Sequence, residues 1–342
     1  MPLTYTPRKR FSPQEYAQAI LAADRIMLSR AITLIESKLP SDVALAEKVL
    51  EIILPHTGNS LRVGITGVPG VGKSTFIESF GKLITGMGKK LAVLTIDPSS
   101  QRSKGSILGD KTRMESLAND PMAYIRPSAS GATLGGVNNK TRETMLLCEA
   151  AGYEVILIET VGVGQSETTV AEIADFFLLL MLAGAGDELQ GIKKGIMEMA
   201  DALVITKADG DNVTMSQMAA REYANAMRLF PAQDSGWEPE VLTCSSVEQR
   251  GLDAIWDVIV RHHELMCKTG YFQAKRMEQN IAWMNEIIDY YLKYDFLHAP
   301  AVSEVLDFTQ HQVESGKLPA ITAAKRLLER FRGESAEGTD GK

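Results

Sequence analysis

Residues 67–75 read Gly67-Val68-Pro69-Gly70-Val71-Gly72-Lys73-Ser74-Thr75, the most specific motif of the chain for a fold class. It matches GxxxxGK[ST], with a short apolar run at 61–66 before it and a helical pattern to about residue 84 after it. The glycines let successive backbone N–H groups turn toward phosphate oxygens, and the helix N-terminus adds partial positive charge. Lys73 is expected to reach the outer phosphates and Ser74 to offer its hydroxyl to Mg²⁺. The predicted phosphate-binding residues are Gly67, Pro69, Gly70, Val71, Gly72, Lys73, Ser74 and Thr75.

Short β-rich runs alternate with helical stretches on both sides of this loop. The runs lie at 61–66, 91–96, 155–158, 176–182, 203–206 and 240–243. Near-continuous apolar strands between helices are typical of a mostly parallel sheet covered on both faces. Helical periodicity precedes them at about 13–55, and no strand pattern follows residue 270. We predict an α/β fold with an N-terminal helical extension (1–57), a P-loop domain (58–269) and a C-terminal helical arm with a polar tail (270–342).

Two adjacent apolar stripes run along the predicted helix of the arm. One stripe is formed by Ile281, Met284, Ile288 and Tyr291, and the other by Trp283, Ile287, Tyr290 and Tyr294. A helix that covers only its own core needs one stripe, so the second indicates a further packing partner. A helix wedged between the core and its neighbours and a seam between subunits both fit this pattern.

The composition narrows the class of protein. The 342 residues are 45% hydrophobic and 23% charged, as in folded globular chains, and the net charge of -7 gives no basis for nucleic-acid binding. The longest apolar run, 176–185, is about half the length of a membrane span, and the N-terminus lacks an apolar signal segment. Cys148, Cys244 and Cys267 show no CxxC spacing and fit a reducing compartment. We predict a cytoplasmic protein with no nucleic-acid or membrane partner.

Acidic residues close two of the predicted strands. Asp97 follows one apolar run and Glu159 another, and Asp110 stands in GDKTR shortly after the first. Each acid alone also fits a helix cap or a turn. Together they are better explained by a shared ligand, since α/β proteins bind ligands at the carboxyl ends of their strands. These carboxylates can act on Mg²⁺ directly or through water.

The residues after Glu159 indicate how a terminal phosphate would be sensed. Gly162 stands three residues on, where a backbone N–H can contact that phosphate. Ras-like proteins carry a water-orienting Gln immediately after the Gly, whereas this chain has Val163 there and Gln165 further on. This arrangement predicts slow intrinsic hydrolysis unless another group completes the site.

Residues 206–209 indicate which base is bound. Thr206-Lys207-Ala208-Asp209 is similar to the guanine motif NKxD, with Thr in place of Asn. The Asp209 carboxylate can accept from guanine N1–H and the 2-amino group, a donor pair that adenine lacks. Lys207 would lay its aliphatic stem over the base. The stretch 243–246, which contains Ser245, lies where a backbone N–H could meet guanine O6. The P-loop leaves ATP and GTP open, and these residues favour GTP.

Longer strings resemble one family. They are GITGVPGVGKST, IDPSS, GSILGDKTRM, RPSASGATLGG, TRETMLLCEAAGYEVILIETVGVGQSE and AGDELQGIKKG, within roughly residues 14–295. Together they resemble the methylmalonyl-CoA mutase-associated GTPases of the MeaB/ArgK type, which belong to the SIMIBI class of P-loop GTPases. The resemblance departs at Thr206, where the family commonly has Asn, and it fades toward the C-terminus.

The resemblance implies a chaperone that binds GTP and hydrolyses it to GDP and phosphate. Such a protein gates adenosylcobalamin loading and protects a cobalamin-dependent acyl-CoA mutase, which in turn stimulates hydrolysis. The family pattern implies a homodimer through the C-terminal arm, and Lys193 as the candidate for supporting hydrolysis. It places Mg²⁺ near Ser74, Asp97, Asp110 and Glu159. The γ-phosphate and switch residues are then Gly162, Gln165, Asp187, Glu188, Gln190 and Lys193.

Other interpretations stay open at this stage. By its residues alone, the segment 184–195 also fits a helix-starting loop with solvated lysines. A kinase or transport-linked ATPase would need ATP preference and an acceptor site, for which the sequence has no signature. A nickel metallochaperone of the same class would need a His-rich or Cys-rich tract, whereas the five His and three Cys are scattered.

Overall fold

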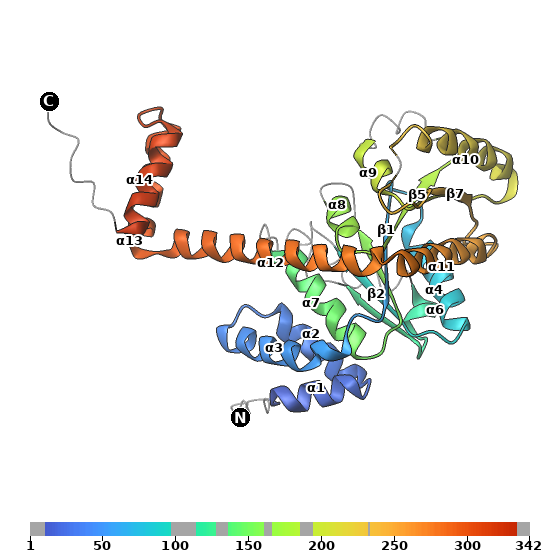
Figure 1. Cartoon of the computed structure of the whole chain (residues 1–342), viewed down its shortest axis with the longest axis horizontal. Helices are drawn as coiled ribbons and strands as arrows, with labels where there is room; N and C mark the ends of the chain where they lie inside the picture. Colours follow the sequence, from blue (N-terminus) through green and yellow to red (C-terminus); the bar gives the residue numbers. More distant parts are fainter. Residues whose placement is uncertain are drawn as a thin grey trace, which may run out of the picture. The chain divides into compact units, whose positions relative to one another are not determined.

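The computed structural model describes residues 11–96, 114–127, 136–160, 166–184, 194–231 and 233–333 (Figure 1). Within them lies a seven-stranded sheet with the order β3-β2-β4-β1-β5-β6-β7, in which every pair is parallel. The strands are β1 (Leu61–Gly67), β2 (Leu91–Ile96), β3 (Ala123–Pro127), β4 (Val155–Thr160), β5 (Phe176–Leu182), β6 (Ala202–Thr206) and β7 (Glu240–Thr243). The predicted α/β fold is confirmed, and the strand before the phosphate loop is the central one.

β3 is a strand that the sequence patterns did not predict. It pairs only with β2, from Leu91 opposite Ala123 to Thr95 opposite Pro127, and so forms the edge of the sheet. Its five residues end in Pro127, which has no N–H to donate. Proline is tolerated at such an edge because no further strand pairs there. The short run and its proline give a weak strand pattern, which explains the omission.

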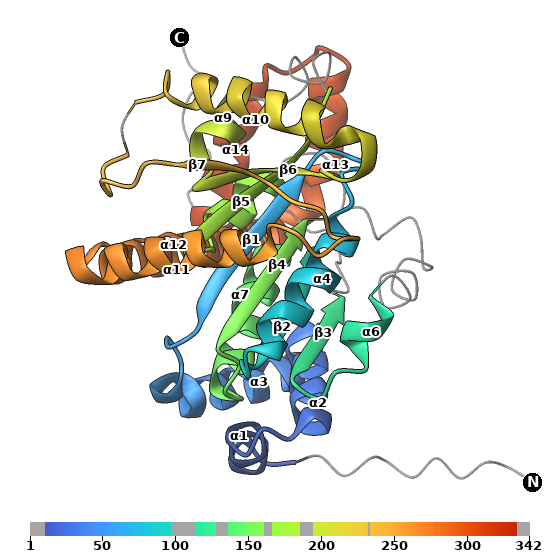
Figure 2. The ribbon, with the colours of Figure 1, turned by 90° about the vertical axis from the view of Figure 1, so that its right-hand side faces the viewer.

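Helices cover both faces of the sheet. Figures 1 and 2 show α4 and α6 on one side and α7 on the other, and Figure 1 shows α8 on the side of α7; α2 and α3 pack on α7. None of the helices in the described ranges is long and apolar enough to cross a membrane. The helices as far as α12 are α1 (Pro13–Leu21), α2 (Arg25–Glu36), α3 (Pro40–Ile53), η1 (Leu54–His56), α4 (Lys73–Gly86), α6 (Glu115–Ala118), α7 (Gly136–Ala150), α8 (Ser166–Ala171), α9 (Lys194–Met199), η3 (Gly210–Asn212), α10 (Val213–Met227), α11 (Leu252–Thr269) and α12 (Tyr271–His298).

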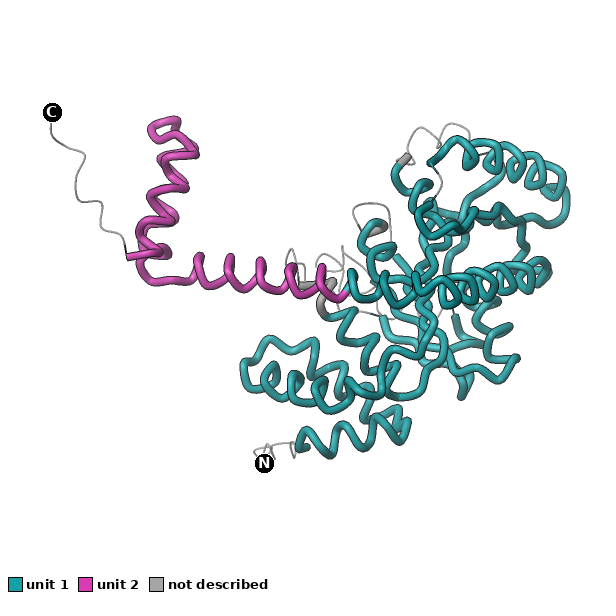
Figure 3. Tube along the Cα trace, in the orientation of Figure 1, with its two compact units in different colours: residues 1–279 teal, residues 280–342 magenta. Residues whose placement is uncertain are grey.

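The chain divides into two compact units, residues 1–279 and 280–342 (Figure 3). The second unit contains the end of α12, α13 (Pro300–Glu314) and α14 (Ala320–Arg332). Its helices meet through an edge-to-face contact between Phe296 and Phe331, with ring centroids 5.3 Å apart. The first apolar stripe of the arm stays open to solvent in the single chain, with exposed fractions from 46% to 55% at Ile281, Met284, Ile288 and Tyr291.

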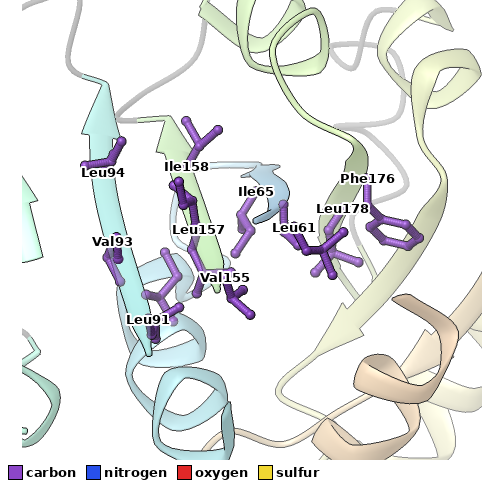
Figure 4. Packing of buried hydrophobic residues seen from close by; sticks show 14 of the residues in the cluster. Leu61, Ile65, Leu91, Val93, Leu94, Val155, Leu157, Ile158, Phe176 and Leu178 are labelled. Carbon is purple, nitrogen blue, oxygen red and sulfur yellow. The ribbon is translucent and has the colours of Figure 1, made fainter. Parts of the chain in front are cut away.

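The core of the first unit lies between the sheet and its helices. Figure 4 shows Leu61 and Ile65 of β1 with apolar side chains of the neighbouring strands β4 and β5. Every residue of β1, β2 and β4 is buried. Burial on both faces explains why these strands are near-continuous apolar runs in the sequence.

A buried ion cluster lies beside the N-terminal ends of the central strands β1 and β5. It is formed by Arg62, Glu149, Asp175 and Arg276. Arg62 Nε donates to Glu149 Oε1 at 2.8 Å, and its N–H donates to Asp175 Oδ2 at 2.8 Å. Arg276, from α12, donates to both oxygens of Asp175 at 2.9 and 2.7 Å. Burial raises the pKa of Glu149, but Arg62 and Arg276 outweigh it and hold that pKa below its ordinary value. The cluster fixes the start of α12 to the sheet.

Candidate nucleotide-binding site

The phosphate loop begins where β1 ends. A Cβ at Gly67 would lie 2.4 Å from Leu180 O, so only glycine allows β1 to approach β5 this closely. Gly70 and Gly72 have φ of 76° and 91°, in the left-handed region that glycine adopts without strain. The chain can therefore turn sharply and enter α4 directly after Gly72.

Side-chain and backbone contacts hold the loop in this shape. Lys73 Nζ donates to Gly67 O at 2.8 Å, which places its ammonium group across the loop. Val71 N–H donates to Val68 O at 3.2 Å, and Phe76 N–H donates to Gly72 O at 2.9 Å in the first turn of α4. The eight predicted phosphate-binding residues thus form one continuous loop and helix start, and phosphate binding itself stays a prediction.

Ser74 and Glu159 come together beside the loop. Glu159 is buried in β4, opposite Ile65 of β1, and its Oε1 lies 3.5 Å from the Ser74 hydroxyl that donates to it. A carboxylate and a hydroxyl at the carboxyl ends of strands are oxygen ligands of the kind that Mg²⁺ prefers. Asp97 and Asp110 lie outside the described residues, so the structure places two of the four predicted metal ligands.

The six predicted γ-phosphate and switch residues also lie outside the described residues. They are Gly162, Gln165, Asp187, Glu188, Gln190 and Lys193. The strands that lead into their two segments are β4 and β5, which flank β1 on either side. Both segments therefore leave the sheet next to the strand that carries the phosphate loop.

The predicted base-binding residues converge after β6 and β7. Lys207, with φ of 55°, donates from Nζ to Gly70 O at 2.8 Å. The Ser245 hydroxyl donates to Asp209 Oδ2 at 2.6 Å, and Ala208 N–H donates to Cys244 O at 2.9 Å. Lys207 and Asp209 after β6 thus lie together with Ser245 after β7, and we call these three residues the base turn; Lys207 binds it to the phosphate loop.

Two side chains of this site, Thr206 and Ser79, make contacts that were not predicted. The Thr206 hydroxyl lies 2.8 Å from Val71 O and 3.3 Å from Met181 O, so the end of β6 is tied to the phosphate loop. The Ser79 hydroxyl of α4 donates to Ser246 O at 2.9 Å. In the sequence, Thr206 stands out only as a departure from the Asn of the guanine motif. A buried hydroxyl needs an acceptor, and that requirement was the available signal.

The Cys244 thiol, beside the base turn, is a poor nucleophile. Burial, with Asp209 adding to it, raises the pKa of the Cys244 thiol to about 12, so the thiol is protonated at neutral pH. A metal site at Cys267 and His263 on α11 would need a third ligand; their Sγ and Nε2 atoms lie 3.6 Å apart. Within the described ranges, no group of three or more His, Cys, Asp or Glu residues could hold a metal ion.

The parallel sheet, with GxxxxGK[ST] between its central strand and the next helix, defines a P-loop nucleotide-binding protein. The family described as "Methylmalonyl Co-A mutase-associated GTPase MeaB" matches residues 28–301. The chain belongs to this family, as the resemblance in the sequence indicated.

Relatives are similar over most of their length. GTPase ArgK of Escherichia coli is 48% identical over 272 residues, which cover 80% of this chain and 82% of that protein. The methylmalonic aciduria type A homolog, mitochondrial, of Mus musculus is 43% identical over 334 residues, which cover 95% and 80% of the two chains. The crystal structure of LAO/AO transport system kinase, 38% identical, superposes with a TM-score of 0.75 over 94% of this chain and 97% of that chain.

Proposed function

We propose that this protein binds GTP, hydrolyses it to GDP and phosphate, and serves as a chaperone of an adenosylcobalamin-dependent acyl-CoA mutase. In this role it gates cofactor loading and protects the mutase from inactivation. The observation that carries the nucleotide part is the direct tie between the base turn and the phosphate loop, in which Lys207 Nζ donates to Gly70 O at 2.8 Å. The mutase part rests on membership of a family described as mutase-associated.

The loop, the base turn and the proposed Mg²⁺ ligands have different roles in the proposed nucleotide complex. The loop N–H groups and the α4 N-terminus hold phosphate oxygens, and Lys73 exchanges Gly67 O for the β- and γ-oxygens. Asp209, held by Ser245, accepts hydrogen bonds from guanine N1–H and the 2-amino group. Ser74, Glu159, Asp97 and Asp110 would hold Mg²⁺, directly or through water. When bound, Mg²⁺ neutralises charge on the phosphate oxygens.

Hydrolysis is proposed to be slow in the free protein and faster with the mutase. Val163 stands where Ras-like proteins carry their water-orienting Gln, so this chain lacks that group in the usual place. Gly162, Gln165 and the additional switch with Asp187, Glu188, Gln190 and Lys193 are proposed to respond to the γ-phosphate. Lys193 is proposed to complete the site when the partner is bound.

We further propose that two copies associate through the arm, residues 270–342. Its first stripe leaves four large apolar side chains about half exposed in the single chain, which is costly in water. A second copy would cover them. The proposed division is then a helical extension (1–57), a GTP-binding domain (58–269) and this arm.

A cytoplasmic location completes the proposal. Cys148 and Cys244 are buried and Cys267 is exposed, and all three are free thiols. Free cysteines fit a compartment that keeps thiols reduced.

Nucleotide binding and turnover with and without methylmalonyl-CoA mutase test the proposal. We expect the protein to bind GTP in preference to ATP and the mutase to accelerate GTP hydrolysis. The GTP-bound and GDP-bound states should bind the mutase with different affinities. Lys73→Ala should abolish tight nucleotide binding, whereas Lys89→Ala, at an exposed residue of the same unit, should not. Equal mutase binding in both nucleotide states, without acceleration of hydrolysis, would contradict the chaperone role.

A kinase function is the second candidate, since one solved structure that superposes well is that of a transport system kinase. That function requires preference for ATP. Asp209→Asn separates the two, because an amide can donate to the C2 carbonyl of xanthine where a carboxylate accepts from guanine. Loss of GTP preference with gain of xanthosine triphosphate binding supports GTP as the substrate, and unchanged selectivity contradicts the assignment of Asp209.

A further inference from the structure

Thr206 ends β6 with its side chain almost fully enclosed, at 2% exposure. Its hydroxyl lies 2.8 Å from Val71 O and 3.3 Å from Met181 O. Both neighbours are carbonyl oxygens, which only accept, so the hydroxyl donates its single hydrogen to them. The shorter contact is the one to the phosphate loop.

This hydrogen bond acts on the direction of a loop N–H group. Val71 O and the N–H of Gly72 belong to one peptide unit, and a trans peptide points them to opposite sides. The described residues contain no cis peptide bond. Because Thr206 holds Val71 O toward β6, the N–H of Gly72 is turned away from β6. Without the hydroxyl, the left-handed glycine at 72 leaves this peptide free to rotate.

A second tie lies directly beside the first. Lys207 Nζ donates to Gly70 O at 2.8 Å, so two successive residues at the end of β6 hold two successive carbonyls of the loop. Lys207 is exposed, whereas Thr206 is buried. Water competes little for a buried hydrogen bond, so the Thr206 tie is the more permanent of the two.

We propose that Thr206 is a positioning residue that sets the phosphate loop for nucleotide binding and makes no contact with the base. An Asn side chain has two N–H donors and could hold Val71 O while donating a second hydrogen to the base. Thr has one hydrogen, and it is already given to the loop. Position 206 therefore controls affinity for every nucleotide with a diphosphate and leaves base choice to Asp209. This inference rests on the proposed binding of guanine nucleotides.

The test compares Thr206→Val, which keeps the shape and removes the hydroxyl, with Thr206→Ser, which keeps the hydroxyl. Dissociation constants are measured for GDP, 7-deaza-GDP, which lacks the N7 acceptor, and IDP, which lacks the 2-amino group. The temperature is kept well below the melting point of each variant. We expect Thr206→Val to weaken all three by the same factor, roughly 3- to 10-fold, since one neutral hydrogen bond is lost. Thr206→Ser should bind like the wild type.

The ratio of GDP to 7-deaza-GDP affinity separates positioning from base contact. If Thr206→Val changes that ratio, or binds all three nucleotides as tightly as the wild type, the inference is wrong. Should Thr206→Val not fold, Thr206→Asn replaces it, and its added donor should raise the ratio above the wild-type value. An unchanged ratio in Thr206→Asn would overturn the inference. Wild-type protein that binds no guanine nucleotide would contradict the proposed function itself, whereas normal wild-type binding with an unaffected Thr206→Val contradicts this inference alone.

Discussion

The Ser245 hydroxyl donates a 2.6 Å hydrogen bond to Asp209 Oδ2, across 36 positions of sequence. Ser245 is fully buried, and its Oγ also accepts from Glu248 N–H at 3.0 Å. The Ser245 hydroxyl therefore orients the Asp209 carboxylate, and the Glu248 N–H in turn fixes the position of that hydroxyl. In the proposed complex, Asp209 would present an already oriented oxygen to the base, so that little side-chain freedom is lost on binding.

Removal of the Ser245 hydroxyl should reduce the selectivity for guanine over other bases. In Ser245→Ala we expect GTP affinity to fall roughly tenfold, since hydrogen bonds to charged groups contribute about 1.5 kcal/mol or more. The preference for GTP over ITP should fall as well, because Asp209 is less well aligned. Ser246→Ala is the matched control, since Ser79 bonds the backbone of that residue. Equal GTP:ITP ratios in Ser245→Ala and wild type would remove Ser245 from base selection.

Gly67 should tolerate no side chain. In Gly67→Ala the Cβ would lie 2.4 Å from Leu180 O and 2.9 Å from Leu180 Cβ, so β1 and β5 would have to separate. We expect the free energy of unfolding to drop by more than about 2 kcal/mol, as in other overpacked cores. Gly86→Ala, at the end of α4 with nothing within 4 Å of the new Cβ, should be neutral or slightly stabilising. Urea unfolding measures the free energy of unfolding of both variants. Equal values for Gly67→Ala and Gly86→Ala would contradict the packing argument.

Arg276→Ala should strongly destabilise the first unit. The substitution leaves Asp175 buried without the guanidinium that bonds both its oxygens, and it removes a charge 3.8 Å from Glu149. Loss of one partner from a buried pair costs about 3–5 kcal/mol. Arg261→Ala, which breaks an exposed pair with Glu240, should cost under about 1 kcal/mol. A small effect of Arg276→Ala in urea unfolding would mean that the cluster is not needed for stability.

His262 is expected to make stability depend on pH. Its ring packs edge-to-face against Phe176 and Trp237, with centroids 5.0 Å away in each case. Its Nδ1 makes no hydrogen bond within the described residues, and Nε2 lies 3.8 Å from Asp201 Oδ1. The imidazole is thus enclosed without a hydrogen bond to stabilise a charge.

Burial, and then Lys275, lower the pKa of His262 from 6.5 to about 3, and Asp175 opposes the shift only in part. Between these two values the unfolded chain binds more protons than the folded one, so stability is full above about pH 6.5 and falls as the pH drops toward 3. From pH 7.5 to pH 5 we expect a loss of about 2 kcal/mol. Urea unfolding of wild type and His262→Phe at both pH values tests this. The same loss in both proteins would show that another group is responsible.

The fold and the phosphate loop could be predicted because their signals are local. Gly70, Gly72 and Lys73 stand within a few residues of one another, and the strands around them are buried apolar runs. Lys207 and Asp209 were likewise readable as a pair after a strand. The contacts that join these parts were not readable. The Thr206 hydroxyl bonds a carbonyl 135 positions away, and its choice of partner depends on β5 lying between β1 and β6 in the sheet.

The buried ion cluster also decides where this chain can be shortened. The helical pattern suggests a cut after residue 269, yet Arg276 compensates Glu149 and Asp175 from beyond that point. Gln279 continues the link, as its Nε2 donates to Ala174 O and its own carbonyl accepts from Arg142, both at 3.0 Å. A chain that stops at 269 should therefore aggregate or be degraded on expression, whereas one that stops at 285 should be recovered folded. The first turns of α12 therefore belong structurally to the first unit, which needs them to neutralise its buried carboxylates.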